Sequence, residues 1–223
     1  MRGLFVTGTD TGVGKTVVAG AICAALAARG ERVAAFKPVV TGLDEPLDGD
    51  WPRDHELLAA AANAGQAPGD VAPLTFGPAV SPHYAAELAA TEIDPPALSA
   101  APRAAADRAD LLIVEGVGGL LVPLTPDCSV RDLAADLGLP LVIVARTGLG
   151  TIGHTLLTVE AARVAGLRVA GIVMTPWDRP EPIEESNRAT VERLADVSVS
   201  VLAPTAPDAL AAAGGSFPLD RWL

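Results

Sequence analysis

The segment that most constrains this chain is residues 8–16, with the sequence Gly-Thr-Asp-Thr-Gly-Val-Gly-Lys-Thr. It follows a short apolar run and precedes a long helix-forming stretch, which predicts a strand, a glycine-rich loop and a helix in succession. Glycines let successive backbone N–H groups point at one anion, and a helix that begins near Lys15 adds the positive end of its dipole. In such loops the lysine contacts the β- and γ-phosphates of a nucleotide, and the next hydroxyl binds Mg²⁺. We therefore predict nucleotide phosphate binding, with Lys15 and Thr16 in these two roles.

The composition limits the class of protein. The 223 residues suffice for one large α/β domain, and the net charge of −11 argues against nucleic acid or an anionic membrane as a partner. The apolar runs end well before about 18 residues, so no transmembrane helix is expected, and no signal-peptide pattern is visible. The two cysteines, Cys23 and Cys128, do not suggest a disulfide framework. Together these features predict a cytoplasmic protein.

Apolar strand-like segments alternate with helical segments along the chain. The predicted strands cover residues 3–7, 32–36, 110–114, 141–145, 169–174 and 197–202. The predicted helices cover residues 15–29, 53–64, 83–90, 96–108, 129–137, 152–165 and 181–194. This alternation predicts a single domain over residues 1–223, with a doubly wound, mostly parallel α/β sheet and helices on both faces. Ligands of such sheets bind beyond the carboxyl ends of the strands, so segments 8–16, 37–42, 115–119 and 148–153 are expected to meet at one crevice.

Two charged residues at predicted strand ends are candidates for phosphate chemistry. Glu115 directly follows a buried apolar strand, where a carboxylate can hold Mg²⁺. Lys37 follows the second strand on the same edge as Lys15, so it can supply a second cation over a transferring phosphate. Thr41 can donate a hydrogen bond nearby. A second metal carboxylate is expected at Asp54, which abuts a helix start, with Asp44, Asp48 and Asp50 as alternatives.

Three segments together resemble the dethiobiotin synthetase family, a P-loop NTPase-like family. Residues 8–16 match its Gly-Thr-Asp-Thr-x-Val-Gly-Lys-Thr, residues 37–42 match Lys-Pro-Val-x-Ser/Thr-Gly, and residues 114–119 match Val-Glu-Gly-x-Gly-Gly. The resemblance extends over essentially the whole chain. It implies a ligase of biotin biosynthesis that uses ATP and Mg²⁺ to convert 7,8-diaminononanoate and CO₂ (or bicarbonate) into dethiobiotin. The implied route passes through a carbamate and a carbamic-phosphoric mixed anhydride.

The resemblance also implies roles for individual residues. Lys15 and Lys37 would be catalytic, stabilising the phosphates and the carbamate. The nucleotide would contact Thr11, Gly12, Val13, Gly14, Lys15, Thr16, Thr175 and Pro204, and Mg²⁺ would bind Thr16, Asp54 and Glu115. The substrate would contact Thr11, Lys37 and Thr41. Because the family is homodimeric, the carboxylate of the substrate would lie at a helix N-terminus of the second subunit, at Leu149, Gly150 and Thr151.

The chain departs from the family pattern at three positions. Gly12 stands where some members have Glu, which affects side-chain contacts of the loop and not its phosphate-binding backbone. Gly153 stands where some members have Asn, so one carboxylate contact is either missing or replaced by Thr151. Thr175 stands where some members have an Asn that contacts adenine. The base is then recognised by backbone around residues 201–204, or other nucleotides such as CTP are accepted.

The alternative function is a ParA/MinD-like ATPase switch that acts through a protein partner. Those proteins carry a lysine at the start of the phosphate-binding loop, where this chain has Asp10. The acidic net charge also disfavours a DNA-dependent role. The sequence therefore favours the synthetase.

Overall fold

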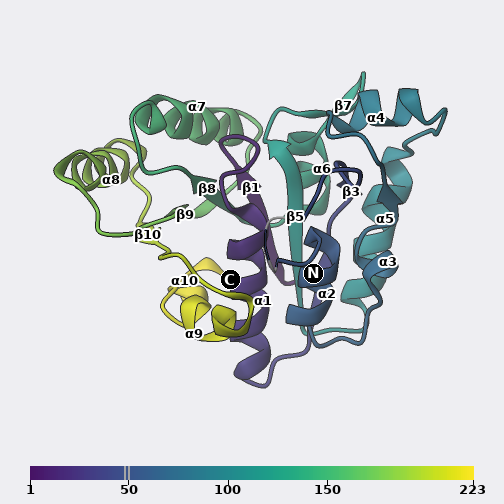
Figure 1. Ribbon diagram of the computed structural model, residues 1–223, viewed down its shortest axis with the longest axis horizontal. Coiled ribbons are helices and arrows are strands. Elements are labelled where there is room, and N and C mark those ends of the chain that lie inside the picture. Colours follow the sequence, from purple (N-terminus) through teal and green to yellow (C-terminus); the bar gives the residue numbers. More distant parts are fainter. Residues whose placement is uncertain (48, 50) are drawn as a thin grey trace.

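The computed structural model describes residues 1–47, 49 and 51–223. Its centre is a six-stranded sheet in the order β10-β9-β8-β1-β5-β2, and every neighbouring pair is parallel (Figure 1). The strands are β1 (Gly3–Gly8), β2 (Val33–Phe36), β5 (Leu111–Gly119), β8 (Leu141–Ala145), β9 (Val169–Met174) and β10 (Val199–Val201). The predicted parallel α/β fold is thus confirmed.

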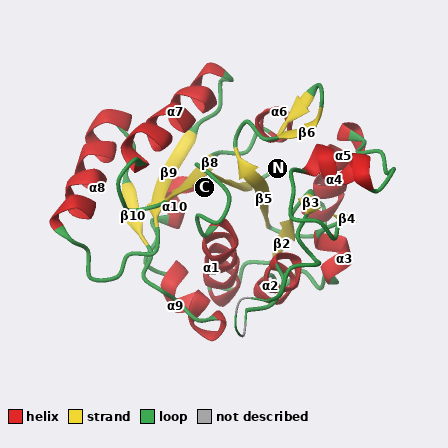
Figure 2. Cartoon of the chain, turned by 45° about the horizontal axis from the view of Figure 1, so that its top comes forward, coloured by secondary structure: helices red, strands yellow, loops and turns green. Residues whose placement is uncertain are grey.

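Helices cover both faces of this sheet, as Figure 2 shows. On one face, Leu4 and Val6 of β1 pack in a core with α1 (Lys15–Ala28), α2 (Asp54–Ala61), α9 (Leu210–Gly214) and α10 (Leu219–Trp222). On the other face, Phe5 packs with α4 (Pro82–Leu88), α5 (Pro95–Ala106) and α6 (Val130–Leu137), while Ile143 packs with α7 (Thr151–Val164) and α8 (Pro182–Ala195). Because both faces are buried, the strands are mostly apolar, and Glu115 of β5 is an exception.

Shorter elements connect the main layers. They are α3 (Pro68–Val71), the pair β3 (Val39–Val40) and β4 (Leu74–Thr75), the pair β6 (Pro123–Thr125) and β7 (Cys128–Ser129), and the 3₁₀ turn η1 (Pro207–Ala209). Within the described residues, no helix combines the length and the apolar character needed to cross a bilayer.

The predicted strands and helices are all present, and their bounds agree within three residues except at one strand end; α3 and β4 lie in the predicted connection 68–82. β5 was expected to stop at Val114, but it continues through Glu115 and pairs Gly119 with Gly8 of β1. The pairing register shifts after Glu115, where the chain is rich in glycine and Gly118 has a φ of +62°. This extension carries Glu115 within the sheet, opposite Val6 of β1, which lies two residues before the phosphate-binding loop.

Two helices begin in the same way. α1 and α7 each have 14 residues and each follow a glycine in the left-handed region, Gly14 with φ 90° and Gly150 with φ 92°. Neither N-terminus has a side-chain cap. Such helix starts leave backbone N–H groups available to an anion, so both strand ends have the local geometry of a binding loop.

Candidate active site

A cavity of about 630 Å³ opens at the carboxyl ends of β1, β2 and β5. Most of the sequence-predicted site residues line it: Thr11, Gly12, Val13, Gly14, Lys15, Thr16, Lys37, Thr41, Asp54, Glu115, Thr175 and Pro204. Among the described residues, those that line the cavity do not include Leu149, Gly150 or Thr151. The expectation that four strand-end segments meet at one crevice is therefore wrong for segment 148–153.

The phosphate-binding loop is tightly placed between its neighbours. A Cβ on Gly14 would lie 2.8 Å from the methyl group of Thr175, so glycine is needed here for space as well as for its φ. The Lys15 ammonium is buried and donates to the carbonyl oxygen of Asp10 at 2.8 Å. Burial, together with the nearby charge of Lys37, lowers the pKa of Lys15 to about 8.

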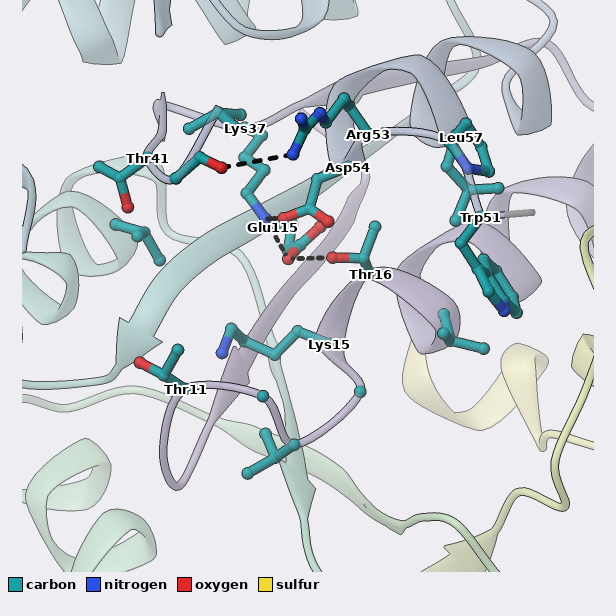
Figure 3. Close-up of a pocket in the computed structure, with 18 of the residues that line it drawn as sticks. Thr11, Lys15, Thr16, Lys37, Thr41, Trp51, Arg53, Asp54, Leu57 and Glu115 are labelled. Atoms are coloured by element: carbon teal, nitrogen blue, oxygen red, sulfur yellow. Dashed lines mark hydrogen bonds and ion pairs between the residues drawn. The ribbon is translucent and has the colours of Figure 1, made fainter. Parts of the chain in front are cut away.

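A buried ion cluster lies beside this loop, as Figure 3 shows. The Nζ of Lys37 lies 2.5 Å from Oδ2 of Asp54 and 2.6 Å from Oε1 of Glu115. The hydroxyl of Thr16 donates to the same Glu115 oxygen at 2.9 Å. Burial opposes the charge on Lys37, but the carboxylates of Glu115 and Asp54 outweigh it and raise the pKa of Lys37. Lys37 therefore keeps its proton at neutral pH.

The oxygen atoms of this cluster fit a magnesium ion. Glu115 is 1% exposed, and among the described residues its Oε2 has no hydrogen-bond partner. A buried carboxylate oxygen without a partner is costly, and a cation would satisfy it. Glu115, Asp54 and the hydroxyl of Thr16 are hard oxygen donors of the kind Mg²⁺ prefers.

The structure also separates the alternatives for the second carboxylate. Asp54 lines the cavity and contacts Lys37. Asp44 instead lies against Gly77, because its backbone N–H donates to the Gly77 carbonyl oxygen at 2.9 Å. Asp48 and Asp50 lie outside the described residues. Among the described aspartates, the geometry therefore favours Asp54.

Comparison with known proteins identifies the family. A family model described as an AAA domain matches residues 2–208. A protein of Anaeromyxobacter dehalogenans named ATP-dependent dethiobiotin synthetase BioD is 46% identical over 211 residues, covering 93% of this chain and 92% of the relative. One of the same name from Nitrosospira multiformis is 40% identical over 203 residues, covering 91% and 88%. The chain belongs to the dethiobiotin synthetase family. The resemblance predicted from the three motifs is thus confirmed.

Solved structures show how widely the fold of this dethiobiotin synthetase family member is shared. The cell division ATPase MinD of Pyrococcus furiosus superimposes with a TM-score of 0.56 at 19% identity, covering 91% of this chain and 84% of MinD. A ParA family ATPase of Chlorobium tepidum TLS gives 0.53 at 15% identity, covering 96% and 91%. At these identities the likeness establishes the fold alone.

The loop predicted to reach the substrate from a second subunit is held by side chains of this chain outside the cavity lining. Asn187 of α8 is buried, and its side-chain amide donates to the carbonyl oxygens of Thr147 at 2.9 Å and Gly148 at 3.2 Å. The hydroxyl of Thr151 donates to the carbonyl oxygen of Arg146 at 2.6 Å. Side chains of the same chain thus hold the loop carbonyls, and Leu149 is left 91% exposed.

Sequence analysis missed two arginines and one aromatic residue near the site. Arg53 and Trp51 line the cavity, and Arg146 donates to the Thr11 carbonyl oxygen at 3.0 Å. Nothing in their local sequence marks them. By contrast, the two predicted lysines stand out by composition: Lys15 and Lys37 are the only lysines in the sequence, and both are buried in this site.

Proposed function

We propose that this protein is an ATP-dependent dethiobiotin synthetase, a ligase that forms dethiobiotin from 7,8-diaminononanoate and CO₂ in biotin biosynthesis. One observation carries the proposal for these residues. Lys37 lies between two carboxylates, beside a phosphate-binding loop and within one cavity, in a member of this family. Phosphoryl transfer needs positioning and charge neutralisation more than covalent help, and this arrangement supplies both.

The proposed reaction has three steps. One amine of the substrate attacks CO₂, loses a proton and becomes a carbamate. A carbamate oxygen then attacks the γ-phosphorus of ATP, and ADP leaves as the mixed anhydride forms. The second amine finally attacks the carbonyl carbon, the ring closes, and phosphate leaves with the former carbamate oxygen.

The residues of the cavity divide these tasks among themselves. Backbone N–H groups from Gly12 to Thr16 surround the phosphates, and Lys15 exchanges its bond to the Asp10 carbonyl for the β- and γ-phosphates. Lys37, which keeps its proton, neutralises charge on the carbamate and the transferring phosphoryl group. Thr11 and Thr41 line the same cavity and bind the substrate amines.

Magnesium would be held by Thr16, Asp54 and Glu115. When bound, the ion supplies positive charge to the β- and γ-phosphate oxygens. The partnerless Oε2 of Glu115 supports this assignment within the described residues. The ion needs only one or two carboxylates, because water and phosphate complete its coordination.

The base lies toward Thr175 and Pro204, which line the same cavity. Thr175 replaces a base-reading amide, and its backbone N–H is already bonded to the Ala145 carbonyl oxygen at 3.0 Å. ATP is the nucleotide in the names of the relatives. Acceptance of CTP or other nucleotides is tested by comparing ATP with CTP in phosphate release.

The protein acts as a homodimer through the outer face of α7. Leu157 and Val164 of α7 are 66% and 78% exposed, and their spacing of seven residues places them on one side of the helix, while Leu149, which is 91% exposed, lies in the turn just before it. Large apolar side chains that gather on one exposed side are typical of a protein interface. Association there would bring the Leu149–Thr151 loop to the substrate carboxylate. Leu157→Glu should give the mass of a single chain by light scattering, and an unchanged dimer would contradict this interface.

The first test is coupled phosphate release by purified protein with Mg²⁺ and bicarbonate, with and without the diamine, comparing ATP and CTP. Diamine-dependent phosphate release and a dethiobiotin product are expected. A rate of nucleotide hydrolysis that is the same with and without the diamine would overturn the proposal and favour a ParA/MinD-like switch. A cytoplasmic location and the lack of a nucleic acid partner remain predictions from the sequence.

A further inference from the structure

The side chain of Arg53 joins two parts of the cavity wall. Its Nη1 donates to the carbonyl oxygen of Gly42 at 3.3 Å, and its Nη2 donates to those of Leu43 at 3.0 Å and Glu45 at 2.7 Å. Figure 3 shows the guanidinium directed from the start of α2 toward the segment that carries Thr41. A guanidinium suits this task because its donors are spread over a rigid planar fork.

The segment bound by Arg53 is also fixed from its other side. The N–H groups of Gly42, Leu43 and Asp44 donate to carbonyl oxygens of segment 76–78 at 3.0, 3.1 and 2.9 Å. Gly42 has a φ of +86°, a conformation that other residues adopt only with strain. The backbone N–H groups thus anchor the segment to residues 76–78, and the carbonyl oxygens of Gly42, Leu43 and Glu45 accept hydrogen bonds from Arg53.

Asp54 directly follows Arg53, and its neighbours in the ion cluster are Lys37 and the hydroxyl of Thr16. Its side chain is 45% exposed, and Lys37 is its ion-pair partner. The described side chains of α2 become buried only at Leu57 and Leu58, one turn later. The position of Asp54 therefore depends on where the backbone of Arg53 is held.

We propose that Arg53 is a positioning residue that sets Asp54 at the magnesium site. It acts by tying the first turn of α2 to segment 42–45, and it contacts neither the nucleotide nor the substrate. This inference rests on the proposed function, because it needs Asp54 as a metal ligand. The same contact also holds Thr41 at the substrate side of the cavity.

The test measures ADP binding by calorimetry, once with Mg²⁺ and once with EDTA. Arg53→Met keeps the aliphatic stem and removes every donor, whereas Arg53→Lys keeps one charged nitrogen. Outer residues that orient a metal ligand typically change metal affinity by about 10–100-fold, so Arg53→Met should weaken Mg²⁺-dependent ADP binding by at least about tenfold. Binding in EDTA should stay within about twofold, and Arg53→Lys should recover part of the loss.

Arg29→Met is the matched control. Arg29 is a surface arginine that pairs with Asp220 at 3.2 Å, and it does not line the cavity. This variant should bind ADP as the unaltered protein does in both conditions. Equal weakening of Arg53→Met with Mg²⁺ and with EDTA would overturn the proposal, because Arg53 would then act on the nucleotide or on the fold in general.

A double-mutant cycle with Asp54→Asn tests whether Arg53 acts through Asp54. If it does, adding Arg53→Met to Asp54→Asn should cost less than about twofold more, because coupled residues are not additive. Losses that multiply would overturn the inference. If Arg53→Met does not fold, as judged by circular dichroism, the same cycle with Arg53→Lys decides.

The assay also separates this inference from the proposed function. Lack of diamine-dependent phosphate release in the unaltered protein would defeat the synthetase and leave the ADP calorimetry interpretable. Conversely, the unaltered protein could be an active synthetase while the Arg53 variants keep the normal dependence of ADP binding on Mg²⁺. That outcome would contradict only the positioning role of Arg53. A fall in melting temperature with unchanged dependence on Mg²⁺ would likewise make Arg53 merely structural.

Discussion

The turns that begin α1 and α7 have the same local geometry and opposite surroundings. Each follows a parallel strand, each places a glycine near φ 90° before a helix of 14 residues, and neither has a side-chain cap. A Cβ added to Gly14 would meet the methyl group of Thr175 at 2.8 Å. A Cβ added to Gly150 would have no atom of a described, non-adjacent residue within 4 Å. One turn is enclosed and the other is open.

The neighbouring strands explain the difference. β1 lies beside β5, which brings Glu115 to the first turn, and β2 lies beyond it and brings Lys37. The second turn has α8 as its neighbour, and the Asn187 side chain holds the Thr147 and Gly148 carbonyl groups. The comparison shows that a strand, a glycine and a helix start make an enclosed phosphate and metal site where adjacent strands supply the cations and metal ligands.

Replacing Lys37, which lies beside the enclosed turn, should cause the largest loss of activity. Lys37→Met removes the cation shared by Asp54 and Glu115, and loss of one charge-stabilising group of this kind costs about 10²–10³-fold in kcat. Steady-state phosphate release measures it, with circular dichroism to show that the protein is folded. Unchanged turnover would remove Lys37 from the mechanism.

Glu115→Gln keeps the size of the side chain and removes the charge beside the first turn. The variant should need at least about tenfold more Mg²⁺ for half-maximal activity, because the amide is a poor ligand and Oε2 is lost as an anion. A magnesium titration of phosphate release measures it. Normal metal dependence would make Glu115 a structural residue.

Alanine at the two glycines tests the comparison directly. At both positions a left-handed alanine costs about 1–2 kcal/mol, and at Gly14 the contact with Thr175 adds about 1–3 kcal/mol. Gly14→Ala should therefore destabilise the protein more and weaken ADP binding, while Gly150→Ala should leave ADP affinity within about twofold. Urea unfolding and calorimetry measure both. Equal effects on ADP would mean that enclosure does not distinguish the turns.

The smallest effect is expected at the open turn. Asn187→Ala leaves two partly buried carbonyl groups without their donor, which costs about 1 kcal/mol of stability. The KM for the diamine should rise while ADP affinity stays the same, because Asn187 holds the carbonyl groups just before the Leu149–Thr151 loop, which we propose to bind the substrate carboxylate. A matching change in ADP binding would show that the two turns are coupled.

The sequence alone predicted the fold and most of the cavity wall. Alternating apolar and helical segments indicated the parallel sheet, and Lys15, Lys37, Thr41 and Glu115 could be placed at one sheet edge because carboxyl ends of parallel strands share that edge. These inferences depend on local pattern and topology, which a single sequence carries.

Only the tertiary structure decided which strand-end loops share a cavity. The rule about strand ends does not say on which side of β1 each strand lies, so it could not separate segment 148–153 from the other three. Nor could it find Arg53, because no periodic pattern relates it to its partners at residues 42–45, which precede it by 8 to 11 residues. Strand order and side-chain contacts with backbone carbonyls arise from packing between distant segments, which no local pattern in the sequence encodes.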